Sequence, residues 1–318
     1  MAWVILLGVG DGCRAGESTL VRFGITADAH VQGSGSRENN LLKFVEAMDR
    51  WKADFVIDLG DLAIQVSEGP TTKELHDGQL ENLKRVWKIF RSGSCPAYAV
   101  MGNHDVGWIR GGDEVVAPDD LCAEGSAGED ITKSELLAVT GLPHRYYSFD
   151  VKGVHFIVLD GNNDPAAMQD VPRGRDGVSG GYCIDRKQLA WLADDLAANR
   201  GKTKVVFCHE ELHHTPVEGS GEGGDVPFEP VGKEYSYVDN GWQVREMFST
   251  DGSVLVCFHG HKHESRWTVY GGVHYITVAA VHRRGSFARV TISDKLTIEG
   301  EGEQRSYASP LPARVGSP

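Results

Sequence analysis

Several classes of protein are excluded by what this sequence lacks. No apolar run approaches the roughly 20 residues that a membrane-spanning helix needs. Basic residues are scarce, with 32 Lys and Arg against 45 Asp and Glu and a formal net charge of -13. This balance argues against a nucleic-acid polymer as partner, because such polymers are held largely by Lys and Arg on phosphates. None of the six cysteines forms a CxxC pair, which excludes a zinc knuckle and a thioredoxin-type motif. No GxxxxGKS or GxxxxGKT is present, which excludes a P-loop.

The first 20 residues are expected to be an N-terminal extension before the first core strand. Trp3 to Val9 is apolar, but no Lys or Arg precedes Arg14, whereas a secretory signal usually begins with a basic region. The apolar stretch is also short for such a signal. We therefore expect a cytoplasmic protein, with a signal peptide and export as the alternative.

The chain has 318 residues and 41% hydrophobic content, which fits one large α/β domain. Runs of apolar residues predict strands at 21–27, 55–59, 97–101, 146–151, 154–159, 203–208 and 254–258, and the alternating residues that follow predict further strands to about Gly300. Helical spacing of apolar residues predicts helices at 37–51, 71–90, 186–199 and 238–248. The strand-helix order of the first half implies right-handed crossovers and a largely parallel sheet. We expect the domain to cover 21–300 and residues 301–318 to form a flexible tail.

Polar residues that can bind metals follow five of the predicted strands. They are Asp28-Ala29-His30, Gly60-Asp61, Gly102-Asn103-His104-Asp105, His209 and Gly260-His261-Lys262-His263. Because ligands of parallel sheets bind beyond the carboxyl ends of the strands, this placement supports a single site. Carboxylates, imidazoles and amide oxygens suit hard or borderline metals. Asp61 could bridge two ions with its two carboxylate oxygens, and open positions would remain for water and substrate.

These segments resemble the motifs of the calcineurin-like metallophosphoesterase superfamily, in motif order over residues 21–300. The resemblance implies a four-layer αββα sandwich, in which helices flank two mixed β-sheets and the metal site lies at the C-terminal ends of strands. It implies two divalent or trivalent ions per chain, and Mn, Fe, Zn and Mg all accept parts of this ligand set. Carried over position by position, the first ion would be held by Asp28, His30 and His263. The second would be held by Asn103, His209 and His261, and Asp61 would bridge the two.

The resemblance also predicts a metal-dependent phosphoric ester hydrolase. A metal-bridged hydroxide would attack phosphorus in line. His104 would protonate the leaving oxygen or stabilise developing charge. Asp105 could orient His104, as carboxylates commonly orient working imidazoles.

The C-terminal half is similar to the manganese-dependent ADP-ribose/CDP-alcohol diphosphatase branch of that superfamily. The similar stretches include Gly180-Gly181-Tyr182 and Gln188-Leu189-Ala190-Trp191-Leu192. The sequence departs from the branch at two positions, because the branch typically has Gln in place of His30 and Glu in place of Asp105. We expect a small phosphodiester or a nucleotide-type diphosphate as substrate. A phosphomonoester, including a phosphoprotein, is the alternative.

Three further residues are candidates for substrate binding. Arg173 and Arg175 could hold a second phosphate, and surface solvation is their simpler interpretation. Tyr182 could stack on a base or pack in the core.

Two rival functions are weighed against the phosphoesterase. His209-Glu210-Glu211-Leu212-His213 matches the HExxH signature of zinc proteases, which requires a helix that carries both histidines. A strand is predicted before His209, and Pro216 follows closely, so such a helix is not expected. A binding protein without catalysis would be expected to lack one or more ligands, whereas all seven positions are filled here.

Overall fold

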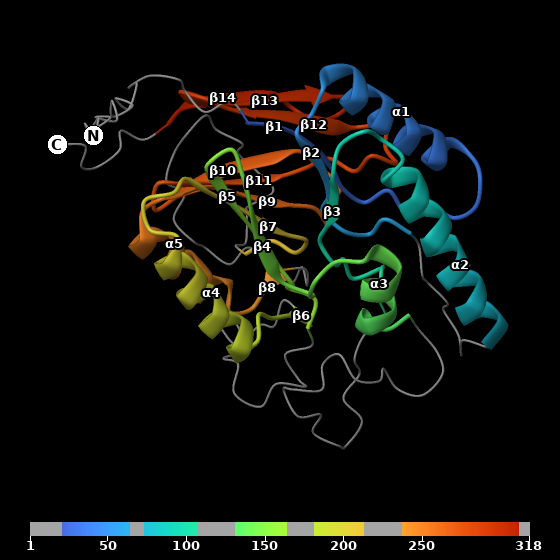
Figure 1. Ribbon diagram of the computed structural model, residues 1–318, viewed down its shortest axis with the longest axis horizontal. Helices are drawn as coiled ribbons and strands as arrows, with labels where there is room; N and C mark the ends of the chain where they lie inside the picture. Colours follow the sequence, from blue (N-terminus) through green and yellow to red (C-terminus); the bar gives the residue numbers. More distant parts are fainter. Residues whose placement is uncertain (1–20, 64–72, 107–130, 164–180, 213–236, 312–318) are drawn as a thin grey trace, which may run out of the picture.

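Two six-stranded mixed sheets form the centre of the domain (Figure 1). The computed structural model describes residues 21–63, 73–106, 131–163, 181–212 and 237–311. The first sheet has the order β14-β13-β12-β1-β2-β3. Its strands are β1 (Val21–Thr26), β2 (Phe55–Asp58), β3 (Ala97–Ala99), β12 (Phe287–Ile292), β13 (Lys295–Glu301) and β14 (Tyr307–Pro310). Parallel pairing of β1 with β2 and of β2 with β3 matches the crossovers expected from the sequence.

The second sheet has the order β10-β11-β9-β7-β5-β4. Its strands are β4 (Tyr147–Val151), β5 (Val154–Leu159), β7 (Lys204–Cys208), β9 (Val254–His259), β10 (Arg266–Tyr270) and β11 (Val273–Thr277). The four central strands run parallel, and the edge strands β4 and β10 are antiparallel to their neighbours. A short parallel pair, β6 (Gly181–Tyr182) with β8 (Tyr237–Val238), lies beside it.

Helices cover the outer face of each sheet (Figure 1). They are α1 (Ser36–Trp51), α2 (Lys73–Phe90), α3 (Lys133–Thr140), α4 (Arg186–Ala198) and α5 (Gly241–Asp251). Apolar residues of α1 and α2 pack with residues of the first sheet, and those of α4 and α5 pack with the second. Among the described residues, no helix is long and apolar enough to cross a membrane.

Aromatic side chains fill the space between the two sheets. Phe23 of β1 stacks on Phe55 of β2, with ring centroids 4.9 Å apart. The same ring lies edge-on to Phe156 of β5 and Phe207 of β7, at centroid distances of 5.4 and 6.0 Å. Burying large rings away from water is the main contribution that holds the sheets together. The predicted four-layer αββα sandwich is therefore confirmed.

Helix α3 and strand β14 are among the elements that were not expected from the sequence. Helix α3 begins at a capping box, in which Thr132 accepts the backbone N–H of Glu135 and Glu135 accepts that of Thr132. Strand β14 lies within the stretch expected to be a flexible tail, and it pairs antiparallel with β13 from Ile298 to Lys295. This pairing satisfies backbone groups that a free tail would leave to water. The expected N-terminal extension, residues 1–20, lies outside the described residues.

Candidate metal centre

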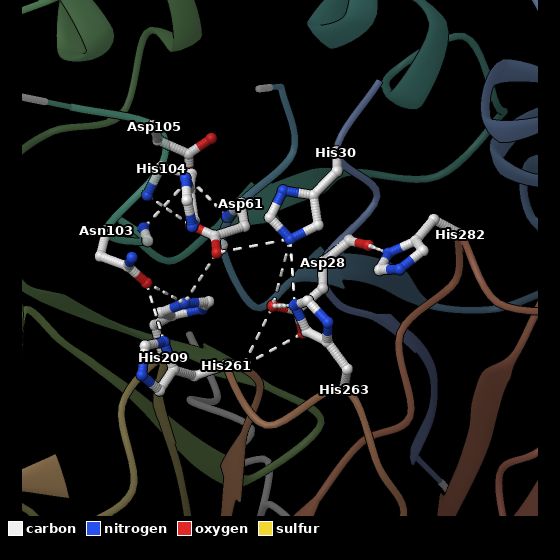
Figure 2. Close-up of polar contacts among 12 residues, drawn as sticks. Asp28, His30, Asp61, Asn103, His104, Asp105, His209, His261, His263 and His282 are labelled. Atoms are coloured by element: carbon white, nitrogen blue, oxygen red, sulfur yellow. Dashed lines mark hydrogen bonds and ion pairs between the residues drawn. The ribbon is translucent and has the colours of Figure 1, made fainter. Parts of the chain in front are cut away.

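The structure brings all seven predicted ligands together at the carboxyl ends of five strands (Figure 2). The first sheet contributes Asp28 after β1, Asp61 after β2 and Asn103 after β3. The second sheet contributes His209 after β7 and the two histidines His261 and His263 after β9. The strand ends of both sheets therefore meet at one place.

Backbone contacts fix the loops that carry these residues. The N–H of Asp28 donates to the carbonyl of Gly60 at 3.0 Å, and that of His30 donates to the carbonyl of Asp61 at 2.9 Å. The residues Asp28, His30, Asp61, His261 and His263 all have φ between 45° and 67°. This left-handed region costs non-glycine residues energy, and such strain gathers at functional sites.

One group of ligands lies around Asn103. The Nδ1 atom of His209 donates to the carbonyl of Leu59 at 2.7 Å, which leaves Nε2 to face the site. That Nε2 lies 3.2 Å from Asp61 Oδ2 and 3.1 Å from Asn103 Oδ1. His261 Nδ1 lies 2.8 Å from the same Asn103 oxygen. Two imidazoles, an amide and a carboxylate thus converge within reach of a single ion.

A second group lies around Asp28. His263 Nε2 is 3.3 Å from Asp28 Oδ1 and 3.1 Å from His30 Nε2. His30 Nε2 is also 3.7 Å from Asp61 Oδ2. Asp28, His30 and Asp61 together form a set whose ligand atoms lie within 4.8 Å of one another. This group matches the predicted ligands of the first ion.

Asp61 belongs to both groups through one oxygen (Figure 2). The sequence prediction used both carboxylate oxygens for bridging. In the structure Oδ1 accepts the backbone N–H of His104 at 2.7 Å, so Oδ2 alone faces His30 and His209. The turn after β3 occupies the other oxygen, so Oδ2 is the atom of Asp61 that faces both ligand groups, and Asp61 would be the residue that two ions held there share.

Burial and neighbouring charges set the protonation of the site. Burial lowers the pKa of His30 to about 3 and that of His261 well below its ordinary value. Burial alone would raise the pKa of Asp61, but His209, His30 and His104 lower it overall. Neutral imidazoles and an ionised carboxylate are the forms that bind metals. His209 differs, because Asp61 raises its pKa against the effect of burial, so an ion would have to displace a proton there.

Asp105 accepts hydrogen bonds from backbone groups of two loops beside the site. Its Oδ2 accepts the backbone N–H of Asp61 at 2.7 Å and that of Gly102 at 3.0 Å, and its Oδ1 accepts that of Leu62 at 2.9 Å. The carboxylate therefore fastens the loop after β2 to the turn after β3, and its role in orienting His104 stays a prediction. His104 itself is half-buried, with its ring edge-on to His30 at a centroid distance of 5.0 Å.

The predicted substrate residues have different outcomes. Tyr182 is buried and lies edge-on to His261, with ring centroids 5.3 Å apart, so packing beside the site describes it best. Burial also raises the pKa of its hydroxyl. Arg173 and Arg175 lie outside the described residues.

The described residues of the HExxH motif, 209–212, do not have the structure of a zinc-protease site. His209 directly follows strand β7, and Glu211 bridges to Tyr237 as an extended residue. The Oε1 atom of Glu211 accepts the hydroxyl of Thr277 at 2.6 Å. Residues 209–212 form bends around this one bridging residue, so they do not form the helix that a zinc protease needs.

Sequence reasoning missed one histidine of the site. His282 follows β11, and its ring centroid lies 5.2 Å from that of His30 and 4.9 Å from that of His263. Burial lowers its pKa. The sequence does carry a signal for this residue, because His282 directly follows an apolar run that ends at Val281. The other predicted ligands also follow apolar runs.

The chemistry of these side chains fits a pair of metal ions. Each group combines imidazole nitrogens with carboxylate oxygen, and the two share Asp61. Such sets suit Mn, Fe or Zn, with Mg accepted at the oxygen atoms.

Comparison with solved structures supports the same fold. A dimetal phosphatase from Danio rerio matches with a TM-score of 0.62 and 16% identity, over 93% of this chain and 100% of that one. A purple acid phosphatase from yellow lupin (Lupinus luteus) seeds matches with a TM-score of 0.56 and 15% identity, over 92% of this chain and 53% of that one. The inner-membrane-complex anchor of Plasmodium matches with a TM-score of 0.52 and 13% identity, over 93% of this chain and 90% of that one. At these identities the matches show the fold alone.

Comparison at the level of sequence families is more specific. No curated protein matches the chain. The family model of the calcineurin-like phosphoesterases matches residues 21–265, which contain all seven predicted ligands. The chain belongs to the calcineurin-like phosphoesterase family and is a metal-dependent phosphoric ester hydrolase.

Proposed function

We propose that this chain hydrolyses a small phosphodiester or a nucleotide-type diphosphate with two metal ions bound at the strand ends. The observation that carries the proposal is the position of Asp61, whose Oδ2 lies between the two ligand groups. Asp28, His30 and His263 would hold one ion, and Asn103, His209 and His261 the other. Ions bound there would lower the pKa of a water between them and neutralise charge on the phosphoryl oxygens.

His104 is the residue proposed to act on the leaving group. Its backbone N–H donates to Asp61 Oδ1 at 2.7 Å, which fixes the turn that carries the imidazole relative to the Asp61 carboxylate. The ring is half-buried, so it borders the site and still reaches solvent. An imidazole in this place can donate a proton to the leaving oxygen. Asp105 is proposed to position this turn through the backbone of Gly102 rather than to touch the substrate.

Two considerations support the substrate class. The similarity of Gly180-Gly181-Tyr182 and the following helix to the diphosphatase branch points to a nucleotide-type diphosphate. Tyr182 lies beside His261, so this segment borders the site.

A substrate screen on metal-loaded protein tests the proposal. The protein is stripped of metal, reconstituted separately with Mn²⁺, Zn²⁺ and Mg²⁺, and offered ADP-ribose, CDP-choline, cyclic nucleotides and simple monoesters. We expect turnover of a diphosphate or a diester, and hydrolysis of monoesters alone would refute the substrate class in favour of a phosphomonoesterase.

Variants then test the residue roles. His104→Ala should keep both ions and lose about 10²- to 10⁴-fold in kcat, the range for a general acid. His76→Ala, a histidine of α2 that pairs with Glu135, is the matched control and should leave kcat unchanged. Unchanged turnover in His104→Ala would remove His104 from the mechanism.

A further inference from the structure

His282 is held against the first ligand group by the backbone around it. The N–H of Val281 donates to the carbonyl of Ala27 at 2.9 Å, and Asn40 Nδ2 donates to the carbonyl of Val281 at 3.2 Å. The imidazole Nδ1 of His282 lies 2.7 Å from the carbonyl of Asp28. Three contacts with the region around β1 and α1 therefore place this ring beside Asp28.

The contact with Asp28 fixes the tautomer of His282. A backbone carbonyl only accepts hydrogen bonds, so Nδ1 must carry the proton. In the neutral ring the lone pair then resides on Nε2, which is the form of histidine that binds metals. Metal-bound histidines commonly donate their other N–H to a backbone carbonyl in this way, because the bond fixes the orientation of the ring.

The position of the ring matches a shared ligand set. One nitrogen from each of His30, His263 and His282 can be chosen so that the three lie within 4.8 Å of one another. Figure 2 shows His282 on the side of Asp28 and His263, away from Asn103 and His209. The ring therefore belongs to the first ligand group only.

We propose that Nε2 of His282 is an additional ligand of the first ion, beyond the residues that the family motifs supply. This inference rests on the proposed two-ion function. It makes the two sites chemically unequal, because the first would offer three imidazoles and the second two. Imidazole-rich sites favour Zn and Fe over Mg, so His282 would bias the first site towards these metals.

Two substitutions separate a ligand from a residue that only holds Asp28 in place. His282→Asn keeps a side-chain N–H that can donate to the carbonyl of Asp28 but removes Nε2. His282→Ala removes both. His274→Asn is the matched control, since His274 is also half-buried and accepts a hydrogen bond from Trp267 at 3.0 Å, outside the site.

The measurement is titration of the metal-free protein with Zn²⁺ by calorimetry, with metal content after dialysis determined by mass spectrometry. Thermal unfolding of each metal-free variant checks that it is folded. We expect His282→Asn and His282→Ala to weaken one of two sites by tenfold or more and to leave the other unchanged, whereas His274→Asn binds as the wild type does. The Zn²⁺-over-Mg²⁺ preference of the weakened site should fall as well.

Three outcomes would overturn the inference. If His282→Asn binds Zn²⁺ like the wild type while His282→Ala does not, His282 acts through Asp28 alone. If both variants bind like the wild type, the ring has no part in metal binding. If the wild-type chain binds fewer than two ions, the proposed function fails together with the inference. In the first two outcomes the wild type still binds two ions, so the inference alone fails.

Discussion

Replacing Gly102 by alanine should displace the site residue Asp61, because an added methyl group would clash with it. A Cβ atom built on Gly102 would lie 2.2 Å from Asp61 Oδ1 and 2.3 Å from the backbone nitrogen of Asp61, whereas ordinary contacts begin at 3.4 Å. The backbone must therefore move by about 1 Å, because a backbone nitrogen cannot rotate away as a side chain can. The effect is purely steric, since Gly102 has no positive φ.

The expected magnitude follows from the contacts that would be displaced. Overpacking costs about 1–3 kcal/mol. The Asp105 carboxylate also accepts the N–H groups of Gly102 and Asp61 at 3.0 and 2.7 Å, and loss of one such buried bond costs about 1–3 kcal/mol. We expect Gly102→Ala to lower the free energy of unfolding by about 2–4 kcal/mol. A displacement near 1 Å at Asp61 should lower kcat about 10²-fold.

Urea unfolding and hydrolysis of bis-p-nitrophenyl phosphate measure the two effects. Gly78→Ala is the matched control, because its Cβ would meet nothing within 4 Å on the exposed face of α2. That change should stabilise the protein by up to about 1 kcal/mol, as alanine does in helices. If Gly102→Ala unfolds within about 0.5 kcal/mol of the wild type and retains its kcat, the close approach of Gly102 to Asp61 is refuted.

Three further results are expected. His155 contacts Asp150 and Asp195 at 2.8 Å, one through each ring nitrogen, and these carboxylates raise its pKa above 6.5 against the effect of burial. The stabilisation of the fold by protonated His155 is therefore complete below pH 6.5 and is lost as the pH rises through the raised pKa. The urea midpoints of the wild type and of His155→Gln should accordingly converge at alkaline pH. In metal-free protein, His263→Gly should be more stable than His263→Ala by roughly 1 kcal/mol in urea, because φ there is 61°; equal stabilities would argue against backbone strain. Chelation should abolish hydrolysis, and each ion restored at about 100 times its Kd should add about 2.7 kcal/mol to the free energy of unfolding. Hydrolysis that survives complete removal of metal would contradict a metal-dependent reaction.

The sequence predicts most of the fold because its signals are local. Apolar runs and helical spacing locate the crossovers of the first half, and the ligands stand directly after predicted strands. Helix α3 is missed because its amphipathic pattern is weak over eight residues, although Thr132, Glu135 and Gly141 mark its two ends. Strand β14 depends on pairing with β13, which no local pattern encodes.

The unpredicted parts of the site depend on contacts between distant segments. His282 approaches the site because Val281 bonds to Ala27, 254 positions earlier in the chain. Asp61 faces both ligand groups through Oδ2 because the backbone of His104 occupies the other oxygen. Spacing along the chain identifies which residues are candidate ligands, but it does not determine which of their atoms are free to bind.

The meeting of both sheets at the site has a mechanical consequence. Asp28, at the end of a strand in one layer, accepts the backbone N–H of His261 from the other layer at 3.1 Å. With ions bound as proposed, metal bonds would join the two layers at this edge, in addition to the apolar cluster that packs between the sheets. Loss of metal would then weaken the contact between the two sheets at the edge that carries the site, and the packing at the opposite edge would be unaffected.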